Sequence, residues 1–175
     1  MNAIAAMTTD QEVGFEPDEI IVSKTDTTGR ITYANGVFVR VSGFTRQELM
    51  GAPHSILRHA DMPRCIFKLL WARLAEGHEV FAYVKNRTKS GAFYWAFAHA
   101  TPNFDAQGQI IGYHSSRRVP DRRIVRDIIS PLYADLLAIE QRASDRKQGM
   151  QASYQALLDQ IQQKGVGYDE FILSL

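Results

Sequence analysis

The chain has 175 residues, of which 45% are hydrophobic and 22% charged, and its formal net charge at pH 7 is +1. This size suits one domain with extensions, and the composition allows a buried core. No apolar run approaches the roughly 18 residues of a membrane span, and the N-terminus lacks the basic region of a signal peptide. The single cysteine, Cys65, excludes an internal disulfide framework. These features predict a soluble, cytoplasmic protein.

The near-neutral charge is unevenly distributed. Residues 1–19 hold five acidic residues and no lysine or arginine, whereas residues 20–120 hold 13 basic and 6 acidic residues. The basic side chains are scattered rather than clustered in one tract, which argues against nucleic acid as a partner. Most of them are expected on a solvated surface, but a basic segment is also suited to an anion such as a phosphate-bearing cofactor.

The first predicted elements form a hairpin. Residues 1–19 are polar and are predicted to be a flexible N-terminal segment. A domain is predicted over residues 20–119. It opens with strands over 20–26 and 30–35, joined by a turn in which Gly29 supplies a positive φ.

Two short helices are predicted after this hairpin. Asn35 is a suitable N-cap for the first helix, and Gly43 suits its end. Thr45 precedes the second helix and Glu48 stands three residues later, which is the pattern of a capping box. Both helices are therefore expected to begin at these polar residues.

The longest helix of the domain is predicted between Pro63, which suits a first turn, and Gly77, which suits the position after a helix end. Its predicted core-facing residues are Ile66, Phe67, Leu70 and Leu74. Strand candidates follow over residues 79–88, 92–101 and 109–118. This order indicates an α+β fold, with a five-stranded antiparallel sheet and short helices on one face.

Residues 120–175 are predicted to form a C-terminal helical extension. Ser130 and Pro131 have the pattern of an N-cap and first residue, so a new helix is expected to start there. Gly149 is expected to end that helix and to separate it from a further one. The extension is a candidate surface for a partner protein. The alternative is that it packs back onto the sheet through Leu132, Leu136 and Leu137.

Few residues in this chain suggest chemistry. The motifs of serine hydrolases, P-loop proteins and zinc proteases are missing and the five histidines lack metal-ligand spacing, so neither an enzyme nor a metal site is predicted. The loop over 57–63 has two possible interpretations. Arg58 and the amides at the start of the following helix could bind an anion, or Arg58 and Asp61 could pair with each other and cap the helix. Asn86, within a half-buried strand, needs partners that a planar ligand or a neighbouring strand supplies.

Aromatic residues concentrate around the central helix and the strands that follow it. They are Trp71, Tyr83, Phe93, Tyr94, Trp95 and Phe97. Most are expected in the core. A cavity lined by the others would suit a planar ligand whose polar edge meets a few hydrogen-bonding groups.

Several segments together resemble one family. They are ITYAN, FVRVSGFTRQELMGAPHSILRHADMP, a tryptophan at position 71, VKNRTKSGAFYW and IIGYHSSR. This combination covers a little over half of the chain and is similar to the PAS domain of bacterial aerotaxis receptors. The resemblance implies a five-stranded antiparallel sheet that encloses FAD, and redox or oxygen sensing in signal transduction.

The resemblance also assigns residues to the cofactor. Arg58, His59 and Asp61 match the RHxDMP block, which the family needs for FAD binding. His54 stands where light-sensing relatives carry a reactive cysteine, so no cysteinyl photoadduct is expected. The remaining candidates for contact with the cofactor are Trp71, Asn86, His114, Asn35 and Trp95, of which Asn35 and Trp95 equally suit capping or packing.

The resemblance implies a signalling mechanism. Reduction of the FAD would change the hydrogen bonds offered by Asn86 and His114, and hence the docking of the helices after Pro120. We expect a homodimer and an unidentified signalling protein that binds in trans. Two alternatives stay open: a PAS adaptor without cofactor, and a haem-based gas sensor with His54, His59 or His114 as axial ligand.

Overall fold

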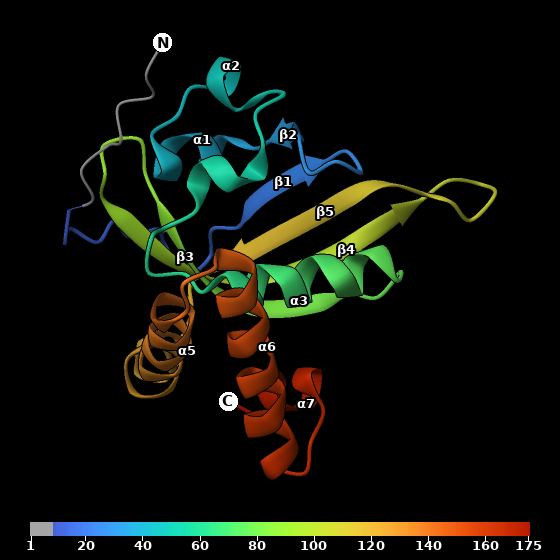
Figure 1. Ribbon diagram of the computed structural model, residues 1–175. Coiled ribbons are helices and arrows are strands. Elements are labelled where there is room, and N and C mark those ends of the chain that lie inside the picture. Colours follow the sequence, from blue (N-terminus) through green and yellow to red (C-terminus); the bar gives the residue numbers. More distant parts are fainter. Residues whose placement is uncertain (1–8) are drawn as a thin grey trace.

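Five antiparallel strands form a single sheet in the order β2-β1-β5-β4-β3, and the long helix α3 lies across one of its faces (Figure 1). The computed structural model describes residues 9–175. All five predicted strands form, and only β4 runs clearly further than expected. The strands are β1 (Ile21–Thr25), β2 (Ile31–Ala34), β3 (Val80–Arg87), β4 (Phe93–Phe104) and β5 (Ile110–Arg118).

The helices of the domain begin and end at the predicted residues. The Asn35 side chain accepts a hydrogen bond from the Phe38 amide at 3.0 Å, and Thr45 forms the expected capping box with Glu48. Gly77 follows α3 with a φ of +86°. These helices are α1 (Gly36–Ser42), α2 (Arg46–Leu49) and α3 (Arg64–Ala75), and the 3-10 helix η1 (His54–Leu57) between α2 and α3 was not predicted.

The segment before β1 runs beside the start of β4. Thr9 N donates to Gly91 O at 2.8 Å, and Val13 N donates to Phe93 O at 2.7 Å. The flexible segment was predicted over residues 1–19, of which the first eight lie outside the described residues. The part that follows them is joined to β4 by these hydrogen bonds.

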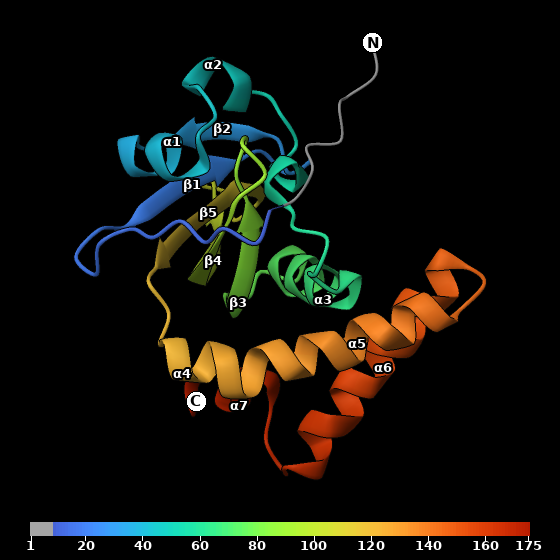
Figure 2. The ribbon, with the colours of Figure 1, turned by 90° about the vertical axis from the view of Figure 1, so that its left-hand side faces the viewer.

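The C-terminal extension begins with one continuous helix (Figure 2). It consists of α4 (Arg122–Ile124), the π-helical turn η2 (Val125–Ile129) and α5 (Ser130–Arg142). α5 begins at Ser130 as predicted, but Ser130 has helical dihedral angles (φ −63°, ψ −45°) and continues the preceding helix, so its predicted role as an N-cap is wrong. Pro131 lacks an amide hydrogen and crowds the carbonyl one turn earlier, and the wider π-turn before it relieves this conflict.

The second helix of the extension starts before Gly149, which lies inside it. α6 (Arg146–Gln163) begins after the N-cap Asp145, whose carboxylate accepts two hydrogen bonds from first-turn amides, and α7 (Tyr168–Leu173) follows α6. Gly149 is buried where α6 contacts α5, and a Cβ atom there would lie 2.5 Å from the Glu140 carbonyl oxygen. The prediction that Gly149 ends a helix is therefore wrong, because this glycine permits close helix packing.

We expect Gly149→Ala to lower the free energy of unfolding by about 1–3 kcal/mol, the usual cost of forcing extra volume into a packed site. The alanine gains helix propensity, but the backbone of α5 must move away from it. Gly167→Ala is the control, because nothing lies within 4 Å of a Cβ atom there. Urea unfolding followed by circular dichroism compares the variants. Wild-type stability of Gly149→Ala would contradict the prediction.

The extension packs back onto the domain and covers the outer edge of β3. Tyr133 Oη donates to Tyr83 O at 2.7 Å, and Tyr168 Oη donates to Phe81 O at 2.9 Å. Leu136 is completely buried, as the packing alternative predicts. Because an uncovered strand edge can pair with another chain, these contacts protect the sheet from association through β3.

A buried carboxylate joins the extension to the start of α3. Glu140 accepts hydrogen bonds from the Cys65 amide at 3.0 Å and from Ser153 Oγ at 2.9 Å, and it pairs with Arg64 Nε at 3.0 Å. The Glu140 residue is only 4% exposed. First-turn amides have no partner within their own helix and favour a negative charge. At the start of α3, the carboxylate of Glu140 from α5 supplies that charge.

Candidate functional site

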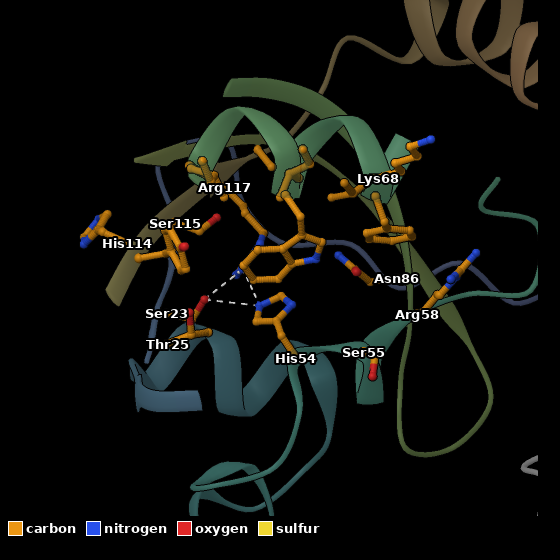
Figure 3. A pocket seen from close by; sticks show the side chains of 18 of the residues that line it. Ser23, Thr25, His54, Ser55, Arg58, Lys68, Asn86, His114, Ser115 and Arg117 are labelled. Carbon is orange, nitrogen blue, oxygen red and sulfur yellow. Dashed lines mark hydrogen bonds between the residues drawn. The ribbon is translucent and has the colours of Figure 1, made fainter. Parts of the chain in front are cut away.

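A cavity of about 350 Å³ lies between α3 and the inner face of the sheet, a size typical of small-molecule sites. Figure 3 shows polar side chains of β1, η1, β3 and β5 around it. Its polar lining includes Ser23, Thr25, His54, Ser55, Asn86, Ser115 and Arg117, its apolar lining Phe67, Leu70, Trp71, Leu74, Val84, Ala98, Ala100 and Tyr113, and further lining residues are Arg58, Arg64, Lys68, His114 and Met150.

The sequence of β4 explains why a cavity forms here. Successive side chains of a strand point to opposite faces, and the inward positions along β4 include Ala96, Ala98 and Ala100. These small side chains leave space above the sheet, and Leu70 and Trp71 of α3 close that space from the other side. The result is a mostly apolar cavity between a sheet and a helix.

One of the six aromatic residues expected near the cavity lines it. Trp71 packs edge-to-face against Tyr113, with 5.4 Å between ring centroids. Trp95 belongs to the opposite face of β4, where its ring lies 6.1 Å from that of Tyr133 in α5. Phe97 likewise stacks with Phe81 on that outer face. The aromatic side chains of β4 therefore serve packing, and its alanines make room for the cavity.

Arg117 is a buried cation at one end of the cavity. It is 2% exposed, and within the described residues no carboxylate lies within 4 Å of it. Its Nη2 donates to Ser23 Oγ at 2.8 Å and to His54 Nε2 at 2.7 Å. Since arginine can only donate, His54 Nε2 is an acceptor and the imidazole is neutral. Burial, with repulsion by Arg117, lowers the pKa of His54 to about 3.

This lowered pKa predicts a loss of stability in acid. An unfolded histidine titrates near 6.5, so below that pH the unfolded chain binds a proton at His54 that the folded protein excludes down to about pH 3. Between about pH 7.5 and about pH 5, the free energy of unfolding of the wild type should therefore fall by about 2 kcal/mol more than that of His54→Gln. His78→Gln, at an exposed histidine, should match the wild type. Urea unfolding at both pH values measures this difference, and equal pH dependence of wild type and His54→Gln would contradict it.

Three buried polar atoms of the cavity have no hydrogen-bond partner within residues 9–175. They are Asn86 Nδ2, Arg117 Nη1 and Thr25 Oγ1. Buried polar groups are nearly always paired, and leaving one unpaired costs about 1–3 kcal/mol. Because the two nitrogen atoms can only donate, the group that pairs with them must present acceptor atoms, as a bound water or a ligand with acceptors does.

The loop between η1 and α3 brings Arg58 to the cavity. Arg58 lines the cavity and lies over the Phe67 ring, 4.8 Å from its centroid. His59 is a buried residue of the same loop, and its Nδ1 accepts a hydrogen bond from the Asp61 amide at 3.1 Å. Asp61 pairs with Lys85 Nζ of β3 at 2.6 Å. His59 and Asp61 therefore shape the loop and hold it against β3, while Arg58 reaches the cavity.

Two further candidates point away from the cavity. The Asn35 side chain caps α1 and donates to Ile20 O at 2.8 Å. His114 is among the lining residues, but it pairs with Thr101 in the β4–β5 ladder and its imidazole points away from the cavity in Figure 3. Arg117, three residues later and on the opposite face of β5, is the side chain that enters. Sequence reasoning missed Arg117, although a charged residue within a half-buried strand is the signal that identifies it.

The remaining features concern metals, thiols and membranes. Within residues 9–175, no three His, Cys, Asp or Glu side chains gather closely enough to hold a metal ion. Cys65 is a buried thiol without a disulfide partner. None of the described helices combines the length and the apolar composition that crossing a bilayer requires.

Comparisons with known proteins identify relatives of the segment that builds the cavity. The family model for the PAS fold matches residues 31–117. The aerotaxis receptor of Escherichia coli (strain K12) is 43% identical over 131 residues, which are 74% of this chain and 25% of the receptor. The nitrogen fixation regulatory protein of Klebsiella pneumoniae is 28% identical over 121 residues, which are 66% of this chain and 24% of the regulator. The chain thus spans about a quarter of the length of these curated relatives.

Solved structures share the fold. The dark structure of the blue-light photoreceptor Aureochrome1 LOV superimposes with a TM-score of 0.55 at 18% identity, over 69% of this chain and 86% of that one. A PAS domain from Colwellia psychrerythraea gives a TM-score of 0.54 at 18% identity, over 59% of this chain and 88% of that one. At this identity the likeness concerns the arrangement of sheet and helices.

Proposed function

Residues 31–117 of this chain belong to the PAS fold family, and from this premise we propose that the protein is an FAD-binding sensor of oxygen or redox state. The FAD occupies the cavity between α3 and the sheet. A cytoplasmic homodimer passes the signal to a partner protein through the C-terminal helices. The family resemblance suggests the cofactor, and the cavity offers support that is independent of it.

The pair of unpartnered donors in the cavity carries this proposal. Asn86 Nδ2 and Arg117 Nη1 are buried without acceptors, in a cavity whose walls are otherwise mostly apolar. The ring system of a flavin is planar, and its carbonyl oxygens and ring nitrogens supply acceptors along its edge. The residues present therefore fit this group. When bound, FAD supplies one- and two-electron redox chemistry.

Five of the lining residues have specific roles in this proposal. Asn86 donates to an acceptor of the ligand and fixes its orientation. Arg117 holds a positive charge in a buried site, which favours the oxidation state of the ligand that carries more negative charge. His54 stays neutral and orients the Arg117 guanidinium through its Nε2. Trp71 and Leu70 cover the cavity and keep water out.

Strand β3 connects the cavity to the extension. Asn86 projects from β3 into the cavity, while the Tyr83 and Phe81 carbonyls of the same strand accept hydrogen bonds from Tyr133 and Tyr168. A change in the hydrogen bond of Asn86 would move β3 and shift the equilibrium between docked and released helices. A partner protein would distinguish these two states.

The cavity favours a flavin over haem. His54 lies in the cavity, and the lone pair of its Nε2 accepts a hydrogen bond from Arg117 at 2.7 Å, so that nitrogen is not available to iron. His59 and His114 are directed elsewhere, as described above.

An absorption spectrum of the freshly purified protein tests the proposed function. We expect bands near roughly 370 and 450 nm that bleach on reduction, and release of FAD on heating. Asn86→Ala should lose the bands while its circular dichroism stays native, and Asn103→Ala, at an asparagine outside the cavity lining, should keep them. A colourless protein that also fails to bind added FAD would refute the proposal and favour a PAS adaptor without cofactor.

A further inference from the structure

A second hollow adjoins the cavity. This groove, of about 490 Å³, lies between the loop that precedes α3 and the two long helices of the extension, and its lining includes Leu137, Gln141 and Ala143. Arg58 and Arg64 line both the groove and the cavity. The two hollows therefore meet at a pair of arginines, and a ligand longer than the cavity can continue into the groove.

The groove carries an excess of positive charge. Its lining includes the guanidinium groups of Arg58, Arg64 and Arg146 and a single carboxylate, that of Glu140, which pairs with Arg64. Within the described residues, neither Arg58 nor Arg146 has a carboxylate within 4 Å. Burial lowers the pKa of Arg58, attraction by Glu140 opposes this shift, and repulsion by Arg64 and Arg146 adds to it. The groove thus holds three guanidinium groups against one carboxylate, with Arg58 at the place where the hollows meet and Arg146 further along the groove.

Helix α6 extends from the groove to the cavity. Arg146 lines the groove, and Met150, one helical turn later, lines the cavity. Residues four apart lie on the same face of a helix, so a single face of α6 borders both hollows. The extension thus contributes side chains to the mouth of the site.

We propose that this groove binds the adenosine diphosphate portion of FAD, with its two phosphates between Arg58 and Arg146. The diphosphate bridge of FAD carries two negative charges, which match the two guanidinium groups that have no carboxylate in direct contact. This inference rests on the proposed function and adds that the C-terminal extension is part of the cofactor site. FAD then holds α6 against α3, whereas riboflavin, which lacks phosphates and adenosine, leaves α6 without that contact.

Calorimetric titration of flavin-free protein with FAD and riboflavin tests this inference. The wild type should bind FAD at least ~10-fold more tightly than riboflavin, because charge-assisted hydrogen bonds to phosphate add to the ring contacts. Arg146→Gln should weaken FAD binding by about fivefold to tenfold and leave riboflavin binding unchanged. Lys147→Gln, which removes a charge from the adjacent residue outside both linings, should change neither affinity.

Limited proteolysis gives a second measurement. FAD should slow tryptic cleavage after Arg142, at the turn between α5 and α6, and riboflavin should not. Equal affinities for FAD and riboflavin, or wild-type FAD affinity in Arg146→Gln, would overturn the inference and leave the proposed function standing. Failure of both flavins to bind would refute the proposed function and this inference with it.

Discussion

Arg117→Met is expected to stabilise the ligand-free protein while weakening its binding of FAD. Arg117 is buried, hydrogen-bonded only to Ser23 and His54, and one of its terminal nitrogens lacks a partner within the described residues. Replacing a buried charge of this kind with an apolar side chain of similar length often raises stability, here by about 1–3 kcal/mol. The same change removes a charged donor from the cavity, which should weaken FAD binding about 10- to 100-fold.

The adjacent arginine provides the control. Arg118 is exposed at the end of β5 and points to the other face of the sheet, so Arg118→Met should leave both properties near their wild-type values. Urea unfolding of the flavin-free proteins and calorimetric titration with FAD measure the two effects. A strongly destabilised Arg117→Met protein would show that the bonds to Ser23 and His54 serve the fold, and would remove the main argument that Arg117 is retained for a ligand.

Glu140→Ala is expected to lower the free energy of unfolding by about 3 kcal/mol. The substitution deletes one carboxylate that accepts from the Cys65 amide, from Ser153 and from Arg64, and it leaves the buried Cys65 amide unpaired. The start of α3 also loses the negative charge that its amides favour. The substitution thus weakens one of the contacts that join the extension to the domain.

Urea unfolding and trypsin sensitivity measure this loss. Glu170→Ala, at an exposed acidic residue of α7, should behave as the wild type. Glu140→Gln should be intermediate, because its amide oxygen can still accept from Cys65 and Ser153 while the charge that pairs with Arg64 is gone. Equal stability of Glu140→Ala and the wild type would contradict the inference that this contact stabilises the docking of the extension on the domain.

Local signals in the sequence predicted the strands and caps of the domain. Asn35, Thr45 and Glu48 each act on amides within a few residues, so their pattern can be recognised without knowledge of the tertiary structure. The extension was harder to predict. A glycine such as Gly149 usually indicates a helix end, but here it allows α6 to approach the Glu140 carbonyl of α5 closely. Pro131 is accommodated by a π-turn, and no residue pattern predicts such a turn.

The site was predicted in part, because alternation along a strand defines two faces without saying which one borders a cavity. Both faces of β4 are apolar, since α5 covers the outer face at Trp95 and the cavity lies over Ala98. In β5 the family resemblance pointed to His114, whereas Arg117 is the side chain that enters the cavity. The Glu140 contact joins residues 75 positions apart, and such long-range pairs cannot be read from one sequence.

Cys65 of α3 is buried against the extension, so the reactivity of its thiol can report whether the extension is docked. Burial raises the pKa of the Cys65 thiol to about 11, so at neutral pH the thiol is protonated and reacts slowly with alkylating reagents. Because Cys65 is the only cysteine in the chain, any labelling reports opening of the structure around this one thiol. A labelling rate that differs between oxidising and reducing conditions, at unchanged global stability, would therefore indicate that the cofactor's redox state controls the docking of the helices, without an introduced probe.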